Sequence, residues 1–202
     1  SVVVSEMLQD APCPTLQIPL TYRLNDKAVL MEKIGKDGLS DFVPISYTPI
    51  LISGRLVDVA ENTENLCVCW KENQRWRDKI INRGVVMDAR KLIELADFGF
   101  PVASDNARDL AGYLRKLEAA NLQQLPTTRV SSTLGWQGRD GRDGFLWGEV
   151  HIQPSGEMVR TPNVEDAGNR EWLPDLISFR GATRGVEQLV SGYHQAGMLE
   201  DW

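Results

Sequence analysis

Two cysteines separated by one residue, Cys67 and Cys69, have a spacing that could support metal or redox chemistry. A structural zinc site needs about four ligands in tetrahedral geometry. The third cysteine and the two histidines of the chain, Cys13, His151 and His194, are scattered without zinc-site spacing. A redox pair would require the turn of a Cys-x-x-Cys motif, which this spacing does not form. We therefore interpret the pair as small side chains that pack in a sheet, and we predict no metal ligands.

A local excess of basic residues follows the cysteine pair. Residues 71–83 contain five basic and two acidic side chains, although the net charge of the whole chain is -6. Ammonium and guanidinium groups neutralise phosphates, and flat aromatic rings stack on bases. The sequence therefore predicts a nucleic-acid-binding segment. Its candidate residues are Lys71, Arg75, Trp76, Arg77, Lys79 and Arg83.

A structural role would account for the same residues. Lysine and arginine are common on the exposed strands of sheet edges, and a tryptophan such as Trp70 is usually buried. Both interpretations stay open at this point. Arg142, in the glycine-rich segment 138–144, is a further candidate for nucleic-acid contact. Asp140 and Asp143 in that segment lack the other ligands of a calcium loop, so we interpret it as a mobile hairpin tip.

Motifs of nucleophilic and phosphate-binding chemistry are missing from the sequence. It has no Gly-x-Ser-x-Gly elbow and no Gly-x-x-x-x-Gly-Lys-Ser/Thr loop. We predict no catalytic residue and no cofactor for this chain. A metal-dependent hydrolase that uses Asp140, Asp143 and Glu149 is a weaker alternative, without a recognisable spacing.

Length and composition indicate an ordinary globular protein. The chain has 202 residues, of which 42% are hydrophobic, enough to bury a core without disulfides. It has no apolar run of the roughly 20 residues that span a bilayer, and its first residues do not form a signal peptide. We expect a cytoplasmic protein with an irregular lead-in over residues 1–18 and a single α+β domain over residues 19–202.

Apolar residues alternate with polar ones in several segments, which predicts strands. Residues 16–35 predict two strands joined at Asn25-Asp26, and residues 43–60 predict a β-rich stretch interrupted at Pro49 and Gly54. Alternation over residues 66–71 predicts a half-buried strand, and residues 75–87 return after a turn. Residues 127–136 and 145–154 predict another strand pair, with His151 facing solvent. Residues 155–176 predict a loop with one short helix.

Helical periodicity appears in three segments. A first helix is predicted to begin at Asp88 and to end before Gly99. A second is capped by Ser104, and a third covers residues 185–202. The residues expected on their apolar faces are Leu92, Ile93 and Ala96; Ala107, Leu110, Ala111, Leu114 and Leu117; and Val186, Leu189, Val190 and Tyr193. The predicted fold class is α+β, with antiparallel sheets built from hairpins, a central helix pair and a C-terminal helix.

The order of these features resembles the domain of unknown function 927 family. The resemblance covers roughly residues 20–200 and is most specific over residues 96–136. It rests on "ADFGFPVASDNARDLAGYL" (96–114), Arg129, "STLGW" (132–136), "GFLWG" (144–148) and "FRGATRGVEQLVSGY" (179–193).

The resemblance implies a setting in DNA replication. Members of the family occur in phages, plasmids and other mobile elements of bacteria, in proteins described as helicases or primase-helicases, ahead of an ATPase core. It therefore implies ATP and Mg²⁺ for that core alone, which would begin after Trp202, so we expect this chain to be an amino-terminal module. It implies as partners DNA, the adjoining ATPase domain, replication proteins and further copies in the full-length protein, without a membrane. The alternative is an assembly module without DNA contact, which the overall acidity and the polar segment 156–175 favour.

Overall fold

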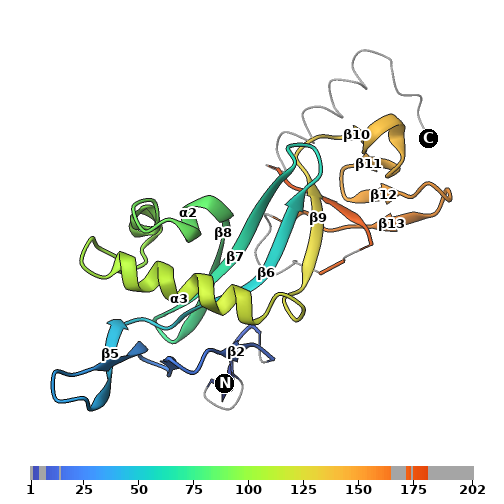
Figure 1. Ribbon diagram of the computed structural model, residues 1–202. Coiled ribbons are helices and arrows are strands. Elements are labelled where there is room, and N and C mark those ends of the chain that lie inside the picture. The colour runs from blue at the N-terminus through green and yellow to red at the C-terminus, as the bar shows by residue number, and fades with distance from the viewer. Residues whose placement is uncertain (1, 5–7, 14, 165–171, 174, 182–202) are drawn as a thin grey trace. The chain divides into compact units, whose positions relative to one another are not determined.

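The computed structural model describes residues 2–4, 8–13, 15–164, 172–173 and 175–181 (Figure 1). The sequence predicts one domain over residues 19–202, whereas the contacts of the chain cluster into two compact units. Unit 1 comprises Ser1–Arg55 and Glu64–Pro126, and unit 2 comprises Leu56–Thr63 and Thr127–Trp202. The predicted C-terminal helix, with His194, lies outside the described residues. Among the described residues, no helix combines the length and hydropathy needed to cross a membrane.

Unit 1 begins with two small antiparallel sheets. Strands β1 (Val2–Val3) and β2 (Gln17–Ile18) pair within the segment predicted as an irregular lead-in. Strands β3 (Tyr22–Leu24), β4 (Val29–Ile34) and β5 (Ser40–Ser46) form a three-stranded sheet. The predicted turn at Asn25-Asp26 is confirmed, since the Asn25 side chain accepts hydrogen bonds from the backbone N–H groups of Lys27 and Ala28.

The remaining strands of unit 1 belong to a larger sheet. Strand β7 (Thr63–Glu72) lies between β6 (Ile50–Asp58) and β8 (Arg75–Asn82), and β8 is the last strand in this sheet. The predicted interruption at Gly54 is wrong, because β6 continues through this residue. The predicted half-burial of β7 is also wrong, since residues 65–70 are buried on both faces. Alternation of side-chain type in β7 therefore does not reflect solvent exposure.

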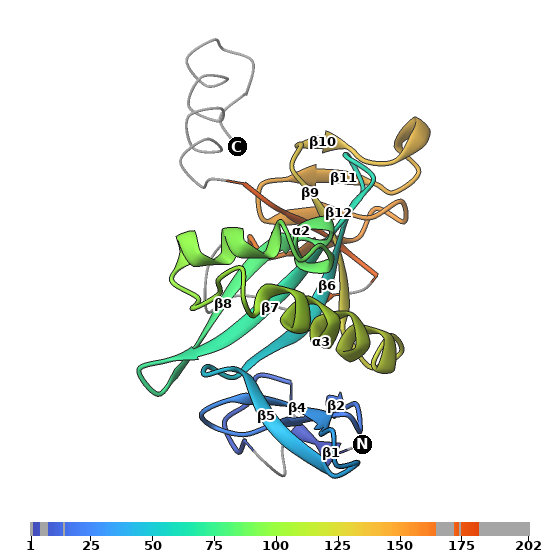
Figure 2. The same cartoon turned by 60° about the vertical axis from the view of Figure 1, so that its left-hand side comes forward.

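Helix α3 (Ala107–Ala120) covers one face of this sheet (Figure 2). Its predicted apolar face is confirmed, because all five residues expected there are buried. The hydroxyl of Tyr113, also buried, donates to the Ile50 carbonyl of β6 at 2.9 Å. The predicted cap is wrong: the helix follows Asn106 rather than Ser104. Asn106 accepts from the Ala103 N–H and donates to the Ile45 carbonyl, so it fixes the turn before the helix.

The predicted first helix of the central pair, from Asp88 to before Gly99, is wrong: a turn at Asp88 and a 3-10 helix take its place. Residues 83–87, predicted as the end of the returning strand, form a separate short α-helix. Helix α2 (Arg83–Met87) follows β8, and the 3-10 helix η1 (Leu92–Phe98) comes next. Asp88 forms a turn between them, where its side chain accepts from the Arg90 N–H. Leu92 and Leu95 are buried, at the three-residue spacing that a 3-10 helix places on one face. The predicted end at Gly99 is confirmed by its positive φ of 90°.

Unit 2 contains a parallel strand pair and a four-stranded antiparallel sheet. Strand β9 (Thr127–Ser131) lies beside β6, whose last residues, 56–58, belong to unit 2, and it pairs in parallel with β14 (Ile177–Phe179). Strands β10 (Gly135–Trp136), β11 (Phe145–Trp147), β12 (Val150–Ile152) and β13 (Met158–Arg160) follow one another in the second sheet. The short 3-10 helix η2 (Arg139–Gly141) lies between β10 and β11.

Several sequence predictions for unit 2 need correction. Residues 127–136 form two strands, β9 and β10, and of these only β10 pairs with β11. Residues 145–154 do not form one strand: Gly148, with a φ of 55°, allows a tight turn between β11 and β12. The segment 155–176, predicted as a loop, contains β13. The α+β class is confirmed for the described chain as a whole, and antiparallel sheets built from hairpins occur in both units; the described residues of unit 2 contain no α-helix.

His151 is buried, not solvent-facing as predicted, with only 2% of its surface exposed. Its Nδ1 accepts a hydrogen bond from the Ile177 backbone N–H at 3.1 Å, so the ring proton resides on Nε2. Nε2 then donates to the Asp143 carbonyl at 2.6 Å. The imidazole therefore joins β12 to β14 and to the turn before β11.

Replacing His151 with leucine is expected to lower the free energy of unfolding by about 2–3 kcal/mol, because it leaves two buried backbone groups without partners. Denaturant unfolding followed by tryptophan fluorescence measures the change. The control variant His151→Asn keeps an acceptor for the Ile177 N–H and should lose less. Equal stability of His151→Leu and the unaltered chain would contradict the assigned bonds.

Candidate nucleic-acid interface

The β7–β8 hairpin carries most of the predicted nucleic-acid contacts. Asn73 and Gln74 form its turn, and both have positive φ angles, 49° and 65°. A two-residue turn with this backbone matches the twist of the two flanking strands. The turn places Glu72 of β7 opposite Arg75 of β8, which fixes the register of the hairpin.

Three of the predicted residues share one face of β8. Alternate residues of a strand point to the same side, so Arg75, Arg77 and Lys79 form a row that we call the β8 basic strip. Because β8 is the last strand in its sheet, the strip follows a sheet edge. The strip is the part of the predicted segment that could follow a phosphate backbone.

The charges of the β8 basic strip are only partly compensated. Arg77 Nη1 lies 3.0 Å from Glu72 Oε2, and both side chains are nearly half exposed. Lys79 Nζ lies 4.8 Å from the centre of the Phe98 ring, and Arg75 is exposed. Within the described part of the chain, neither Arg75 nor Lys79 forms an ion pair. An exposed ion pair is worth at most about 1 kcal/mol, so Arg77 can also exchange Glu72 for another anion.

Lys71 and Trp76 face the opposite side of the hairpin, where they lie opposite each other in register. Lys71 Nζ lies 3.2 Å from Asp10 Oδ2, and its side chain is 10% exposed. The hydrogen bond from Lys71 holds the pKa of the Asp10 carboxyl below its ordinary value of 3.8. Trp76 is half-buried. The structure therefore does not bring these two residues together with the β8 basic strip.

Trp70 is a core residue. Only 1% of its surface is exposed, and its ring meets Phe100 edge-on, with 5.7 Å between centroids. The Arg77 guanidinium carbon lies 5.8 Å from the centre of the Trp70 ring. The buried Trp70 ring therefore packs against Arg77 of the β8 basic strip, and it cannot stack on a base.

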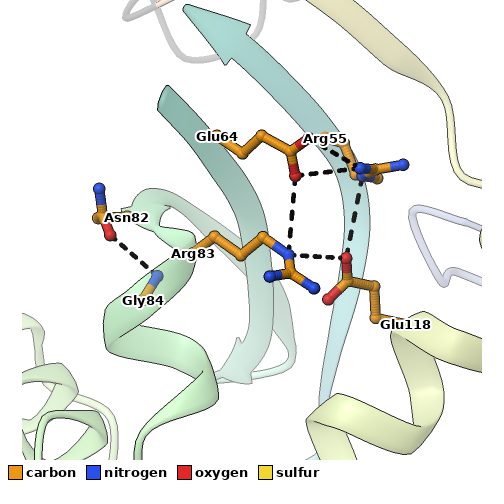
Figure 3. Close-up of polar contacts among 6 residues, drawn as sticks. All are labelled: Arg55, Glu64, Asn82, Arg83, Gly84 and Glu118. Atoms are coloured by element: carbon orange, nitrogen blue, oxygen red, sulfur yellow. Dashed lines mark hydrogen bonds and ion pairs between the residues drawn. The ribbon is translucent and has the colours of Figure 1, made fainter. Parts of the chain in front are cut away.

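Arg83 belongs to a group of four charged residues that ties four elements together (Figure 3). Its Nε lies 3.1 Å from Glu118 Oε1 of α3 and 3.7 Å from Glu64 Oε2 of β7. Arg55 of β6 reaches the same two carboxylates, with its Nη2 3.0 Å from Glu64 Oε2 and its Nε 3.9 Å from Glu118 Oε1. We call Arg55, Glu64, Arg83 and Glu118 the ionic cluster. Because the cluster balances two positive with two negative charges, Arg83 adds little to the strip's field.

The sequence prediction missed the other members of the ionic cluster. One signal was available: Glu118 lies four residues after Leu114 and seven after Ala111, within the apolar face predicted for α3. A carboxylate on a buried face needs a positive partner. No comparable signal identifies Arg55 or Glu64, because their pairing depends on strand register across unit 1.

The thiols of Cys67 and Cys69 are both buried. Cys69 Sγ donates to the hydroxyl of Ser53 at 3.1 Å, and Cys67 Sγ lies 3.5 Å from a carboxylate oxygen of Asp78. Burial in the sheet is what their interpretation as packing residues predicts. In the described ranges, no group of three or more His, Cys, Asp or Glu residues is placed to hold a metal ion. Arg142 belongs to unit 2, whereas the β8 basic strip belongs to unit 1.

Comparison with known proteins gives a family and distant likenesses to solved structures. The family model described as a domain of unknown function (DUF927) matches residues 22–202. No curated protein matches the chain. Among solved structures, "SCCmec type IV Cch - active helicase" is similar at 15% sequence identity and a TM-score of 0.47, over 81% of this chain. This chain spans 27% of the length of that protein.

Proposed function

Since this chain belongs to the DUF927 family over residues 22–202, we propose that it is a non-catalytic module of a mobile-element replicative helicase. In this proposal it assists DNA replication by contacting DNA. Family membership supports the setting in phages, plasmids and other mobile elements, which is part of this proposal. Contact with the adjoining ATPase domain is the second activity that this setting suggests.

The β8 basic strip is the observation that carries the proposal. It places three cationic side chains in one row on a chain with a net charge of -6. Successive side chains on one face of a strand are roughly 7 Å apart, which is close to the phosphate spacing of an extended single strand. Attraction of phosphates to such a row needs no base contact, so we expect little dependence on sequence.

The six predicted residues receive different roles in this proposal. Arg75, Arg77 and Lys79 neutralise phosphates, and Trp76 stacks on a base only where the strand passes around the edge of β8. Lys71 and Arg83 act as structural residues, because their charges are already shared with carboxylates of unit 1.

The charge-reversal variant Arg75→Glu, Arg77→Glu, Lys79→Glu is expected to bind DNA at least about tenfold more weakly at low salt. Fluorescence anisotropy with labelled single-stranded and duplex oligonucleotides measures the affinity. For the unaltered chain on single strands, log K should fall with log salt with a slope of about -2, because each neutralised phosphate contributes about -0.7. The variant should lose this slope.

A matched control changes the net charge equally elsewhere. Lys27, Lys36 and Arg108 are exposed residues of unit 1 outside the hairpin. Their replacement by glutamate should reduce binding much less than reversal of the strip. If both variants bind alike, general charge explains the contact and the strip does not. If the unaltered chain ignores DNA even at low salt but binds the adjoining ATPase domain, the assembly alternative replaces the proposal.

A further inference from the structure

The four-stranded sheet of unit 2 has one buried face and one face rich in exposed apolar side chains. Leu146 and His151, which are paired in register, are both buried. Their neighbours along β11 and β12 point to the opposite face. Register pairs align one row across all four strands on that face. The row consists of Trp136, Phe145, Ile152 and Met158.

Three aromatic rings lie together on this exposed face. We call Trp136, Phe145 and Trp147 the aromatic face. Trp136 is 73% exposed and meets Phe145 edge-on with 5.2 Å between ring centroids. Trp147 is 39% exposed, and its ring lies 6.4 Å from that of Phe145 at an interplanar angle of 18°. Isolated exposed aromatics need no explanation, but neighbouring rings on adjacent strands form a surface suited to a flat ligand.

A hollow of about 520 Å³ opens beside two of these rings. It is lined by Trp136 and Phe145 together with Ile152, Gln153 and the glycines of the neighbouring turns. Ligand sites commonly combine apolar walls with a few polar groups in a volume of this order. The Gln153 amide lies beside the rings, where its Nε2 donates to Glu157 Oε2 at 3.4 Å, a long hydrogen bond that a ligand can replace. This combination fits a nucleobase, which is flat, aromatic and polar at its edges.

Two arginines near the aromatic face are available for phosphates. Arg139 and Arg142 lie between β10 and β11, are exposed, and form no ion pair with any described residue. Asp140 lies between them and offsets part of their charge. Arg160, 75% exposed in β13, pairs with Glu149 at 3.3 Å. Stacking would therefore contribute more to binding here than charge does.

We propose that the aromatic face of unit 2 binds single-stranded nucleic acid by stacking bases on Trp136 and Trp147. Arg139 and Arg142 contact the phosphates of the bound strand. Stacking requires unpaired bases, so duplex nucleic acid is excluded from this surface. The site is separate from the β8 basic strip, and the inference does not depend on the function proposed for that strip.

The test uses the 202-residue chain and a labelled oligothymidylate, with an abasic oligonucleotide of equal length as the second probe. The variant Trp136→Ala, Trp147→Ala should bind oligothymidylate at least about tenfold more weakly, since one stacked base is worth roughly that factor. Binding of the abasic probe should not change between this variant and the unaltered chain. Oligothymidylate should also quench tryptophan fluorescence in the unaltered chain, and the abasic probe should not.

Two further variants separate loss of stacking from loss of folding. Trp136→Phe, Trp147→Phe keeps flat rings and should retain most of the affinity. Tyr47→Ala removes an aromatic ring that is 81% exposed in unit 1 and should leave binding unchanged. Equal affinity for abasic and base-containing probes would overturn the inference. So would self-association of the chain that Trp136→Ala, Trp147→Ala abolishes, in the absence of any base-dependent binding.

The two oligonucleotide probes distinguish the β8 basic strip from the aromatic face. Reversal of the β8 basic strip should lower affinity for both probes, because an abasic strand keeps its phosphates. Loss of the aromatic face should lower affinity for oligothymidylate alone. If only one variant has its expected effect, the other surface's assignment fails by itself.

Discussion

Replacing Glu118 with alanine is expected to lower the free energy of unfolding by about 3 kcal/mol, because it breaks a largely buried ion pair. Glu118 is 2% exposed and lies within 4 Å of arginines from β6 and α2. Without its carboxylate, Arg55 keeps only Glu64, and Arg83 keeps a partner at 3.7 Å. The Arg55 side chain is 21% exposed, so solvent compensates only part of the loss. Urea unfolding followed by circular dichroism measures the change.

Asp109→Ala is the matched control for this prediction. Asp109 is also a carboxylate of α3 with an ion pair, at 3.4 Å to Lys33, but both side chains are more than a third exposed. Its removal should cost no more than about 0.5 kcal/mol. Glu118→Gln keeps the shape of the side chain and should fall between the two variants. The account of the ionic cluster fails if Glu118→Ala costs no more than Asp109→Ala.

Truncation of Trp70 to alanine should cost about 3–5 kcal/mol, the usual range for a large aromatic residue in a close-packed core. The variant would leave a cavity beside Phe100 and beneath Arg77. Unfolding in guanidinium chloride measures the loss, and near-ultraviolet circular dichroism reports on the packing of the remaining rings. Because β8 lies directly beside Trp70, the variant should also weaken DNA binding through disorder of the strip.

A conservative variant distinguishes packing from hydrogen bonding at this position. The buried Nε1 of Trp70 has no hydrogen-bond partner among the described residues. Trp70→Phe therefore loses ring volume without breaking such a bond, and should cost only about 1–2 kcal/mol. Trp136→Ala, which removes an indole that is 73% exposed, should have little effect on stability. A cost for Trp70→Ala close to that of Trp136→Ala would contradict the core assignment.

The sequence predicts the fold best where one local pattern determines the outcome. The apolar face of α3 repeats over four turns, and any helix with that pattern must bury it. The β7–β8 hairpin likewise follows from two adjacent strands with a short turn. Local patterns fail at η1, because the spacing of the buried Leu92 and Leu95 suits one face of a 3-10 helix and of an α-helix alike.

In the candidate site, too, local sequence patterns predict some features and miss those that depend on tertiary contacts. The excess of basic residues in the hairpin is visible in the sequence, and strand alternation alone separates Arg75, Arg77 and Lys79 from Lys71 and Trp76. The sequence does not show which of these positive charges are neutralised by carboxylates. The partners of Lys71 and Arg83 come from residues 10 and 118, so only the tertiary structure reveals them.

The burial of His151 could not be predicted for a similar reason. Its partners, the Asp143 carbonyl and the Ile177 N–H, are backbone groups, which every residue possesses and which therefore leave no trace in the sequence. Exposed aromatics could have been found in part. Phe145 and Trp147 alternate with Leu146, so the pattern places them together on one face of the strand. The pattern does not show which of the two faces is buried, and the structure shows that it is the face of Leu146.

The parallel pairing of β9 with β14 has a consequence for the order in which the chain can fold. In sequence the two strands are separated by the whole four-stranded sheet, so their contact closes a long loop and carries a high entropic cost. During synthesis, β9 emerges from the ribosome well before β14. Until Ile177 has been synthesised, the edge of β9 that pairs with β14 has no partner strand, and the Nδ1 atom of His151 lacks its hydrogen-bond donor. Unit 1 has all of its residues by Pro126, whereas unit 2 must wait at least until Phe179. Folding on the ribosome should therefore proceed in that sequence, with unit 2 maturing last.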